Sequence, residues 1–157
     1  MMLRAGTSRA KAVGKEPPLS GWPQGLDVRV YYEDTDFSGN VYHASYLRFL
    51  ERGRTELLRG LGIEHRRIFD SGGAKGCYFV VRAMTVEFLK PALMDDVLLV
   101  ETGVSKIGGA SIEMYQEIRR GKEVLLTAKV RIAVVSGGKA SRIPVEVLVR
   151  LKAIATP

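Results

Sequence analysis

The strongest pattern along the chain is a helical repeat of apolar side chains over residues 41–61. Apolar and aromatic residues recur there at spacings of three, four and seven, which place them on one face of an α-helix. These residues are Tyr42, Tyr46, Phe49, Leu50, Gly53, Leu57 and Leu61. Asn40 is expected to cap the helix, and Gly60 and Gly62 to end it. Because glycine lowers helix propensity, Gly53 indicates that another backbone comes close to the middle of the helix.

Alternation of apolar and polar residues predicts strands on both sides of this helix. The expected strands cover residues 26–32, 78–90, 95 to the turn at Gly108, 111–120 and 124–135. In two of them the alternating residues are expected to share one face: Leu98, Val100, Thr102 and Val104, and Leu126, Ala128, Val130, Ile132 and Val134. A short amphipathic helix from Pro144 through Ile154 follows them. This order indicates an α+β fold, in which a mostly antiparallel sheet carries one long helix on a face. Because the apolar stripe of the helix is wide, we expect the sheet to curl around it.

Length and composition fit one globular domain. The chain has 157 residues, 46% of them apolar and 26% charged, which is enough for a core but too few for separate substrate and cofactor domains. We expect a mobile N-terminal tail over residues 1–25 and a single domain over residues 26–157. The single cysteine, Cys77, excludes an intramolecular disulfide and a cysteine-cluster metal site.

Neither a membrane span nor a secretory signal is expected. No apolar run approaches the roughly 18 residues of a membrane span, and the N-terminus lacks the apolar run of a signal peptide. The tail contains arginine and serine and has one acidic residue, which leaves an organellar transit peptide as the alternative. A cytoplasmic location is therefore the expectation.

The charge balance favours no nucleic-acid partner. The formal net charge is +7, and the four basic residues and one acidic residue of the tail account for three of these charges. No basic run interleaved with aromatic residues is present. An anionic partner, such as a nucleotide-bearing cofactor or a thioester carrier, accounts for the remaining charge as well as plain solubility does.

The segment from Asp36 to His43 could perform acyl hydrolysis. Asp36 lies in the loop before the helix, and His43 lies in its first turn. Unpaired N–H groups and the positive end of the helix dipole can stabilise an oxyanion there. A nearby carboxylate can act as a nucleophile or as the general base for a water molecule. The competing interpretation is structural, with Asp36 in a turn or cap and His43 at the surface.

The sequence around these two residues resembles a known family. Residues 28–46 read VRVYYEDTDFSGNVYHASY, and residues 49–56 read FLERGRTE. This segment closely resembles the hotdog-fold acyl-CoA thioesterases of the 4-hydroxybenzoyl-CoA thioesterase type, most of all the Tol-Pal-associated (YbgC-like) branch. The resemblance extends over residues 26–150 and includes Phe79–Arg82, Met84–Glu87 and Lys90–Ala92.

The resemblance implies a hotdog fold and a thioester hydrolase that needs no metal or redox cofactor. The substrate would be an acyl-CoA, or an acyl group on acyl carrier protein. Asp36 would be the catalytic carboxylate and the backbone N–H of His43 the carbonyl-polarising donor, with the His43 side chain assisting. Homodimers with joined sheets, paired into homotetramers, would place the site at a subunit interface. Association with cell-envelope proteins would follow from the branch.

Several neighbouring residues are expected to bind the substrate. They are Gly39, Asn40, Val41, Tyr42 and Glu51. Phe37 and Ser38 stand where the branch often has small residues, and Asn40 where it is often apolar, so the acyl preference stays open. Glu51 matches the helix glutamate that some hotdog thioesterases use as the catalytic carboxylate, although a partly buried pair with Arg54 is the favoured interpretation.

The remaining polar candidates are expected to be structural. Asp34 and Asp36 form an Asp-x-Asp pair, but no further ligand cluster supports a Mg²⁺ site. His65 is expected at the surface, and Cys77 is expected to be packed rather than nucleophilic. Exposed cations could meet coenzyme A phosphates, although solvated surface charges are the favoured interpretation; they are Arg82, Lys106, Lys139 and Arg142.

Other functions remain as alternatives. One is a hydroxyacyl-thioester dehydratase, which His43 and Glu51 on one helix match poorly. Another is an acyl-thioester-binding or scaffold protein of the cell envelope without turnover. A basic nucleic-acid-binding module is the weakest. The sequence leaves open the acyl chain, the carrier, and whether Asp36 forms an anhydride or activates water.

Overall fold

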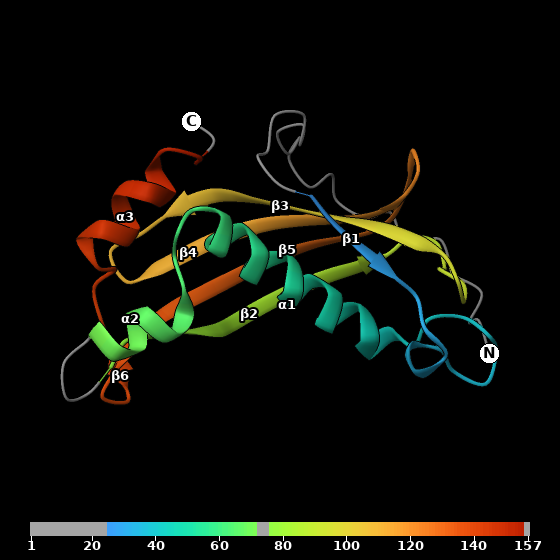
Figure 1. The fold of residues 1–157 in the computed structure, drawn as a ribbon, viewed down its shortest axis with the longest axis horizontal. Coiled ribbons are helices and arrows are strands. Elements are labelled where there is room, and N and C mark those ends of the chain that lie inside the picture. The colour runs from blue at the N-terminus through green and yellow to red at the C-terminus, as the bar shows by residue number, and fades with distance from the viewer. Residues whose placement is uncertain (1–24, 72–75, 156–157) are drawn as a thin grey trace, which may run out of the picture.

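The computed structural model describes residues 25–71 and 76–155 (Figure 1). Its helices are the 3-10 helix η1 (Tyr32–Asp34) and the α-helices α1 (His43–Gly60), α2 (His65–Ser71) and α3 (Val145–Lys152). Its strands are β1 (Gly25–Arg29), β2 (Tyr78–Phe88), β3 (Val97–Ile107), β4 (Ser111–Arg120), β5 (Glu123–Ser136) and β6 (Lys139–Ala140). Among the helices of these two ranges, none combines the length and hydropathy that a membrane crossing requires. The expected tail, residues 1–25, lies outside the described residues except for Gly25, which begins β1.

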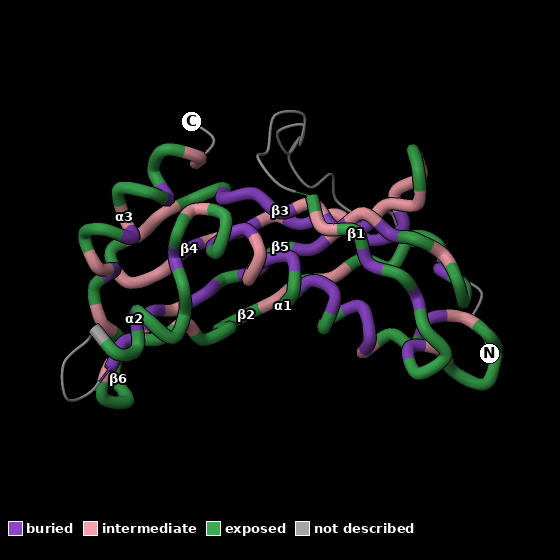
Figure 2. Tube along the Cα trace, in the orientation of Figure 1, coloured by how far each residue is buried: buried purple, intermediate pink, exposed green. Residues whose placement is uncertain are grey.

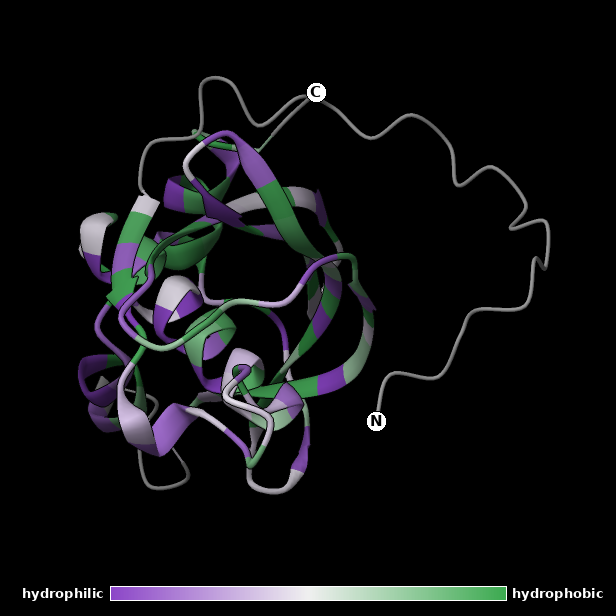
Figure 3. Cartoon of the chain, turned by 90° about the vertical axis from the view of Figure 1, so that its right-hand side faces the viewer, coloured by the Kyte–Doolittle hydropathy of each residue, from purple (hydrophilic) through white to green (hydrophobic). Residues whose placement is uncertain are grey.

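One antiparallel sheet forms the body of the molecule. Its strands lie in the order β1-β3-β4-β5-β2, and the short β6 pairs with β5. α1 crosses one face of the sheet (Figure 1), and a view from the side shows the sheet curling around this helix (Figure 3). The predicted α+β hotdog fold, with an antiparallel sheet wrapped around a long helix, is therefore confirmed.

The apolar stripe of α1 packs against the inner face of the sheet, where buried segments of the helix and strands face each other (Figure 2). Both predicted strand faces are buried: Leu98, Val100, Thr102 and Val104 of β3, and Leu126, Ala128, Val130, Ile132 and Val134 of β5. On the helix, Tyr46, Phe49, Leu50 and Leu57 are at most 4% exposed. Burial of each large side chain contributes about 1.5–3 kcal/mol, before the entropy cost of ordering it.

Gly53 lets α1 approach β3 closely. A Cβ atom at this position would lie 2.7 Å from Cγ1 of Val100 and 3.0 Å from Oγ1 of Thr102. Carbon atoms pack at about 3.5–4.0 Å, so any side chain here would push the helix off the sheet. The close packing expected at Gly53 is thus found, but the nearest atoms belong to side chains of the sheet rather than to another backbone.

A buried polar cluster lies beside this glycine. The side-chain amide of Gln116, on β4, donates to the Leu50 carbonyl at 2.9 Å and to the Thr102 hydroxyl at 2.8 Å. Its oxygen accepts from the Arg54 guanidinium at 2.8 Å. Arg54 is buried and ion-paired with Glu51. These bonds fix the position of α1 along the sheet, because unpaired buried polar groups are costly.

The start of α1 differs from the prediction. The helix begins at His43 rather than residue 41, and Tyr42 rather than Asn40 is the N-cap. Asn40 is unavailable because its backbone forms a β-bridge with Leu93. The strand expected over residues 26–32 already ends at Arg29, where the chain leads into η1.

The sequence did not reveal α2, and the prediction overextended β2, α3 and also β3, which begins at Val97 rather than residue 95. Among the described side chains of α2, only that of Ile68 is buried, so the helix has no apolar stripe to reveal it. β2 ends at Phe88 rather than residue 90, and α3 ends at Lys152 rather than residue 154.

Candidate active site

The loop before α1 is closed on itself by backbone hydrogen bonds. Thr35 and Val41 form a β-bridge, and the Asp36 N–H donates to the Asn40 carbonyl at 2.9 Å. The Tyr42 N–H donates to the Asp34 carbonyl at 2.8 Å. These pairs bring Asp36 back beside the residues that begin α1, although seven positions separate it from His43 along the chain.

The carboxylate of Asp36 is exposed and held in one orientation. Its Oδ1 accepts from the Ser38 hydroxyl and from the Ser38 N–H, the latter at 2.8 Å. These two hydrogen bonds favour the charged form and lower the pKa of Asp36. The group is therefore a carboxylate at neutral pH, and Oδ2 is left for a reactant.

His43 is the first residue of α1, so its N–H has no partner within the helix. No described residue supplies it with an acceptor. The residue is exposed, and its ring lies against that of Tyr42 with centroids 4.4 Å apart. An unpaired N–H at the positive end of an 18-residue helix suits a developing oxyanion.

The predicted substrate-binding residues fall into two groups. Gly39, Asn40, Val41 and Tyr42 complete the loop beside Asp36, and Gly39 has a φ of +80°, which favours glycine. Glu51 lies eight residues beyond His43, which is about 12 Å along the helix axis. Its side chain is 56% exposed and paired with Arg54. The ion pair between Glu51 and Arg54 is confirmed, whereas the predicted partial burial of Glu51 is wrong because its side chain is exposed.

Other candidates take the structural roles expected of them. Asp34 is buried, and its carboxylate accepts from the Tyr31 N–H at 2.9 Å rather than standing beside Asp36. His65 is exposed, and Cys77 is buried, which raises the pKa of its thiol. The four cations considered for coenzyme A phosphates are all exposed.

The segment at Ala92 and Leu93 holds the loop before α1 in place, a role that the sequence did not predict. The Ala92 carbonyl accepts from the Val41 N–H at 2.9 Å, and Leu93 bridges to Asn40. The Ala92 N–H in turn donates to the hydroxyl of Tyr46 at 2.9 Å. The one sequence signal for this contact is the Tyr46 hydroxyl, because a buried tyrosine hydroxyl needs a hydrogen-bond partner.

Comparison with known proteins shows the family to which the chain belongs. The thioesterase-like superfamily model matches residues 30–151. The acyl-CoA thioesterase YbgC of Haemophilus influenzae is 44% identical over 112 residues, which cover 71% of this chain and 80% of that protein. The acyl-CoA thioester hydrolase YbgC of Escherichia coli O157:H7 is 44% identical over 108 residues, covering 69% and 75% of the two chains.

A solved structure gives the same result. A probable thioesterase from Bartonella henselae matches with a TM-score of 0.74 and 43% identity, covering 77% of this chain and 98% of that one. The resemblance to the YbgC-like branch and the expectation of an enzyme are thus both confirmed. The chain belongs to the thioesterase-like superfamily and is a thioester hydrolase.

Proposed function

We propose that the protein is an acyl-CoA thioesterase, which converts an acyl-CoA and water into the free acid and coenzyme A. The observation that carries the proposal is the exposed Asp36 carboxylate, held beside the open N-terminus of α1. The names of the two similar curated proteins support the choice of substrate class. The nucleotide phosphates of coenzyme A also suit a chain with a net charge of +7.

In the proposed reaction, the thioester carbonyl oxygen accepts a hydrogen bond from the backbone N–H of His43. Asp36 then acts in one of two ways. As a base, it takes a proton from water while the hydroxide attacks the carbonyl carbon; as a nucleophile, it forms a mixed anhydride that water hydrolyses. In either route the C–S bond breaks, and the thiolate leaves with the bonding electrons and takes up a proton. The imidazole of His43 supports the water or the leaving thiolate.

We further propose that the protein works as a homodimer. β2 is an edge strand of 11 residues, and among the described strands it pairs only with β5. Apolar side chains along it are 38% to 52% exposed: Tyr78, Val80, Val81 and Phe88. A long apolar edge strand is a template for pairing with another strand. Two copies joined there would form a continuous sheet, and paired dimers would give the tetramer. We place this assembly in the cytoplasm.

The test is release of free thiol from short, long and aromatic acyl-CoAs by the wild type and Asp36→Asn. Asparagine keeps the size of the side chain but removes the base or nucleophile. We expect turnover of at least one substrate and a loss of about a hundredfold or more in the variant. Glu33→Gln, which neutralises an exposed carboxylate in the same region, is the control and should keep full activity.

Two results would contradict the proposal. If the wild type binds acyl-CoA without releasing thiol, the protein is a binding or scaffold protein. If Asp36→Asn and the wild type hydrolyse equally, Asp36 is only a turn residue, and Glu51 becomes the next carboxylate to replace.

A further inference from the structure

The segment between β2 and β3, residues 90–96, contacts both the end of the loop before α1 and the first turn of that helix. Its Ala92 carbonyl holds the Val41 N–H, and Leu93 bridges to Asn40. The Ala92 N–H donates to Tyr46, one turn into α1. The placement of both the Asp36 loop and the first helical turn therefore depends on this segment, which we call the support segment.

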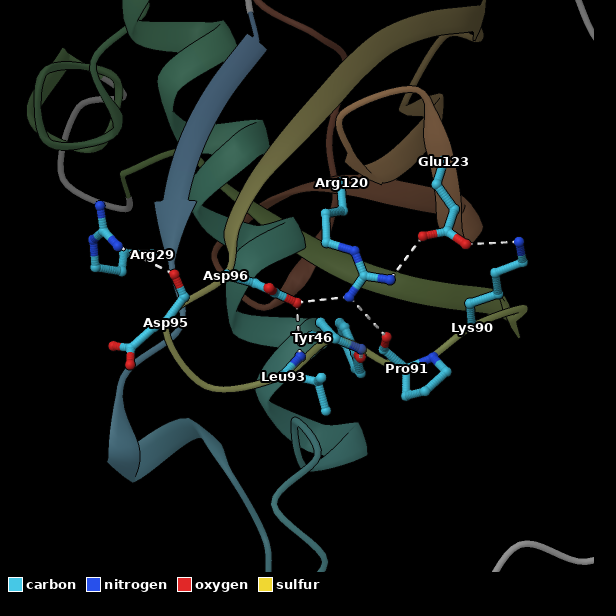
Figure 4. Close-up of polar contacts among 10 residues, drawn as sticks. Arg29, Tyr46, Lys90, Pro91, Leu93, Asp95, Asp96, Arg120 and Glu123 are labelled. Atoms are coloured by element: carbon cyan, nitrogen blue, oxygen red, sulfur yellow. Dashed lines mark hydrogen bonds and ion pairs between the residues drawn. The ribbon is translucent and has the colours of Figure 1, made fainter.

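Charged side chains fasten the support segment to the sheet (Figure 4). At the end of β4, the Arg120 guanidinium bonds to Asp96 Oδ2 at 2.8 Å and to Glu123 Oε2 at 2.7 Å. Lys90 reaches the other oxygen of Glu123 at 2.7 Å. Asp96 and Lys90 belong to opposite ends of the support segment. Arg120 therefore holds the Asp96 end directly, and its pair with Glu123 links it to the Lys90 end.

Asp96 and Arg120 also bond to the backbone of the support segment. Asp96 Oδ2 accepts the Leu93 N–H at 2.9 Å, and a long contact of 3.5 Å joins Arg120 to the Pro91 carbonyl. Burial opposes the charge of Asp96, but the bonds from Leu93 and Arg120 hold its pKa below the ordinary value. Bonds from Lys90 and Arg120 likewise lower the pKa of Glu123. Asp96 and Glu123 are therefore carboxylates at neutral pH.

A strained residue lies inside the same turn. Asp95 has a φ of +67°, the only positive φ among the described residues other than glycine. A non-glycine residue with a positive φ costs free energy, so it is kept only where contacts with the surrounding structure hold it. Here the Asp95 N–H donates to the Val30 carbonyl at 3.1 Å, and the Arg29 side chain donates to the Asp95 carbonyl at 3.1 Å. Contacts from β1, β4 and β5 thus fix one backbone path for the support segment.

We infer that Arg120 is a positioning residue of the active site, which acts through the support segment to hold Asp36 and the His43 N–H in their reactive arrangement. This inference rests on the proposed thioesterase function. Arg120 contacts neither Asp36 nor His43, so its effect on the reaction passes through Ala92, Leu93 and the bonds they make. Misplacement of reacting groups by about 1 Å costs up to a hundredfold in rate.

The chain offers a matched control in the neighbouring residue. Arg119 also pairs with two carboxylates, Glu101 and Glu117, and its side chain is 29% exposed against 35% for Arg120. Its partners belong to β3 and β4 rather than to the support segment. Arg120→Met and Arg119→Met thus remove the same group and two ion pairs each, Arg120→Met inside the support network and Arg119→Met outside it.

The experiment measures two quantities on the full chain of each variant. The first is steady-state hydrolysis of an acyl-CoA that the wild type turns over, and the second is hydrogen exchange of the Val41 amide, followed by NMR. We expect Arg120→Met to lower kcat about tenfold with little change in KM and to raise Val41 exchange about tenfold. Arg119→Met should change neither. Arg120→Lys, which keeps one charge but cannot bridge both carboxylates, should fall between.

The outcomes separate the inference from the proposed function. Equal kcat and equal Val41 exchange in the two methionine variants would overturn the inference. A loss of kcat in Arg120→Met without faster Val41 exchange would also overturn it, because the effect would not pass through the support segment. If the wild type releases no thiol, the proposed function fails, and the exchange measurement alone decides whether Arg120 holds the loop. Should Arg120→Met fail to fold, the wild type, Arg120→Lys and Arg119→Met make the same comparison.

Discussion

The two parts of α1 carry out different tasks. In its first turn, His43 is exposed and its N–H is unpaired toward the described residues. In its middle, Gly53 presses against β3, and Arg54 is buried in a hydrogen-bonded cluster with Gln116. The middle fixes where the helix lies, and the first turn presents reactive groups at that place. A site can stay open to a substrate because its position is determined elsewhere.

The largest effect on stability is expected in the middle of the helix. Gly53→Ala should lower the free energy of unfolding by about 2 kcal/mol, because the new Cβ would lie 2.7 Å from Val100 Cγ1. Alanine is otherwise favoured over glycine in helices by about 1 kcal/mol, so a net loss shows that the close approach outweighs propensity. Urea unfolding of the wild type and the variant measures this change in the free energy of unfolding.

Gly109→Ala is the control for this prediction. A Cβ there meets no atom within 4 Å, so the change should stay within about 0.5 kcal/mol. A stabilised Gly53→Ala variant would contradict the close packing of α1 on β3.

A smaller effect is expected at the open end, in the pH dependence of catalysis. The Ser38 hydroxyl lowers the pKa of Asp36, so Ser38→Ala should raise that pKa. Because the reaction needs the carboxylate, the acidic limb of kcat against pH should move to higher pH, with the plateau above it unchanged. Ser105→Ala, which removes a hydroxyl bonded to the Glu113 carbonyl, is the control. An unmoved limb in Ser38→Ala would argue against Asp36 as the titrating group.

The sequence was most informative where one periodicity dominates. The stripe of α1 from Tyr46 to Leu57 and the alternating faces of β3 and β5 are buried as predicted, because burial follows directly from spacing. The ends of the predicted stripe differ, since Tyr42 is exposed and Leu61 is only partly buried. The significance of Gly53 could also be predicted, since a mid-helix glycine needs a packing reason. α2 could not, because its short sequence has one buried position among those described.

The site was predictable in its residues but not in its supports. Asp36 and His43 stand out by their order before and within a helix, and the family resemblance assigns their roles. Asn40 was taken as the cap because it is a favourable cap residue, but its bridge to Leu93 joins positions 53 residues apart. The contacts of Arg120 with Asp96 and Glu123 are likewise set by how the hairpins pack, which no local pattern reveals.

In the proposed mechanism, the backbone N–H at the start of α1 and the Asp36 carboxylate together carry out the reaction. Comparison of His43→Pro with His43→Ala tests the backbone group directly. Proline is favoured at the first position of a helix and lacks the N–H. The preceding residue, Tyr42, already has the extended conformation that proline requires, with ψ of 134°.

Both variants should therefore fold, which circular dichroism and urea unfolding will check, and both lack the imidazole. We expect His43→Pro to lose about 10²–10³-fold in kcat for acyl-CoA hydrolysis, because it lacks the N–H that stabilises the oxyanion. His43→Ala, which keeps the N–H, should retain clearly more activity. Equal kcat in the two variants would contradict the claim and leave the side chain as the only contribution of His43.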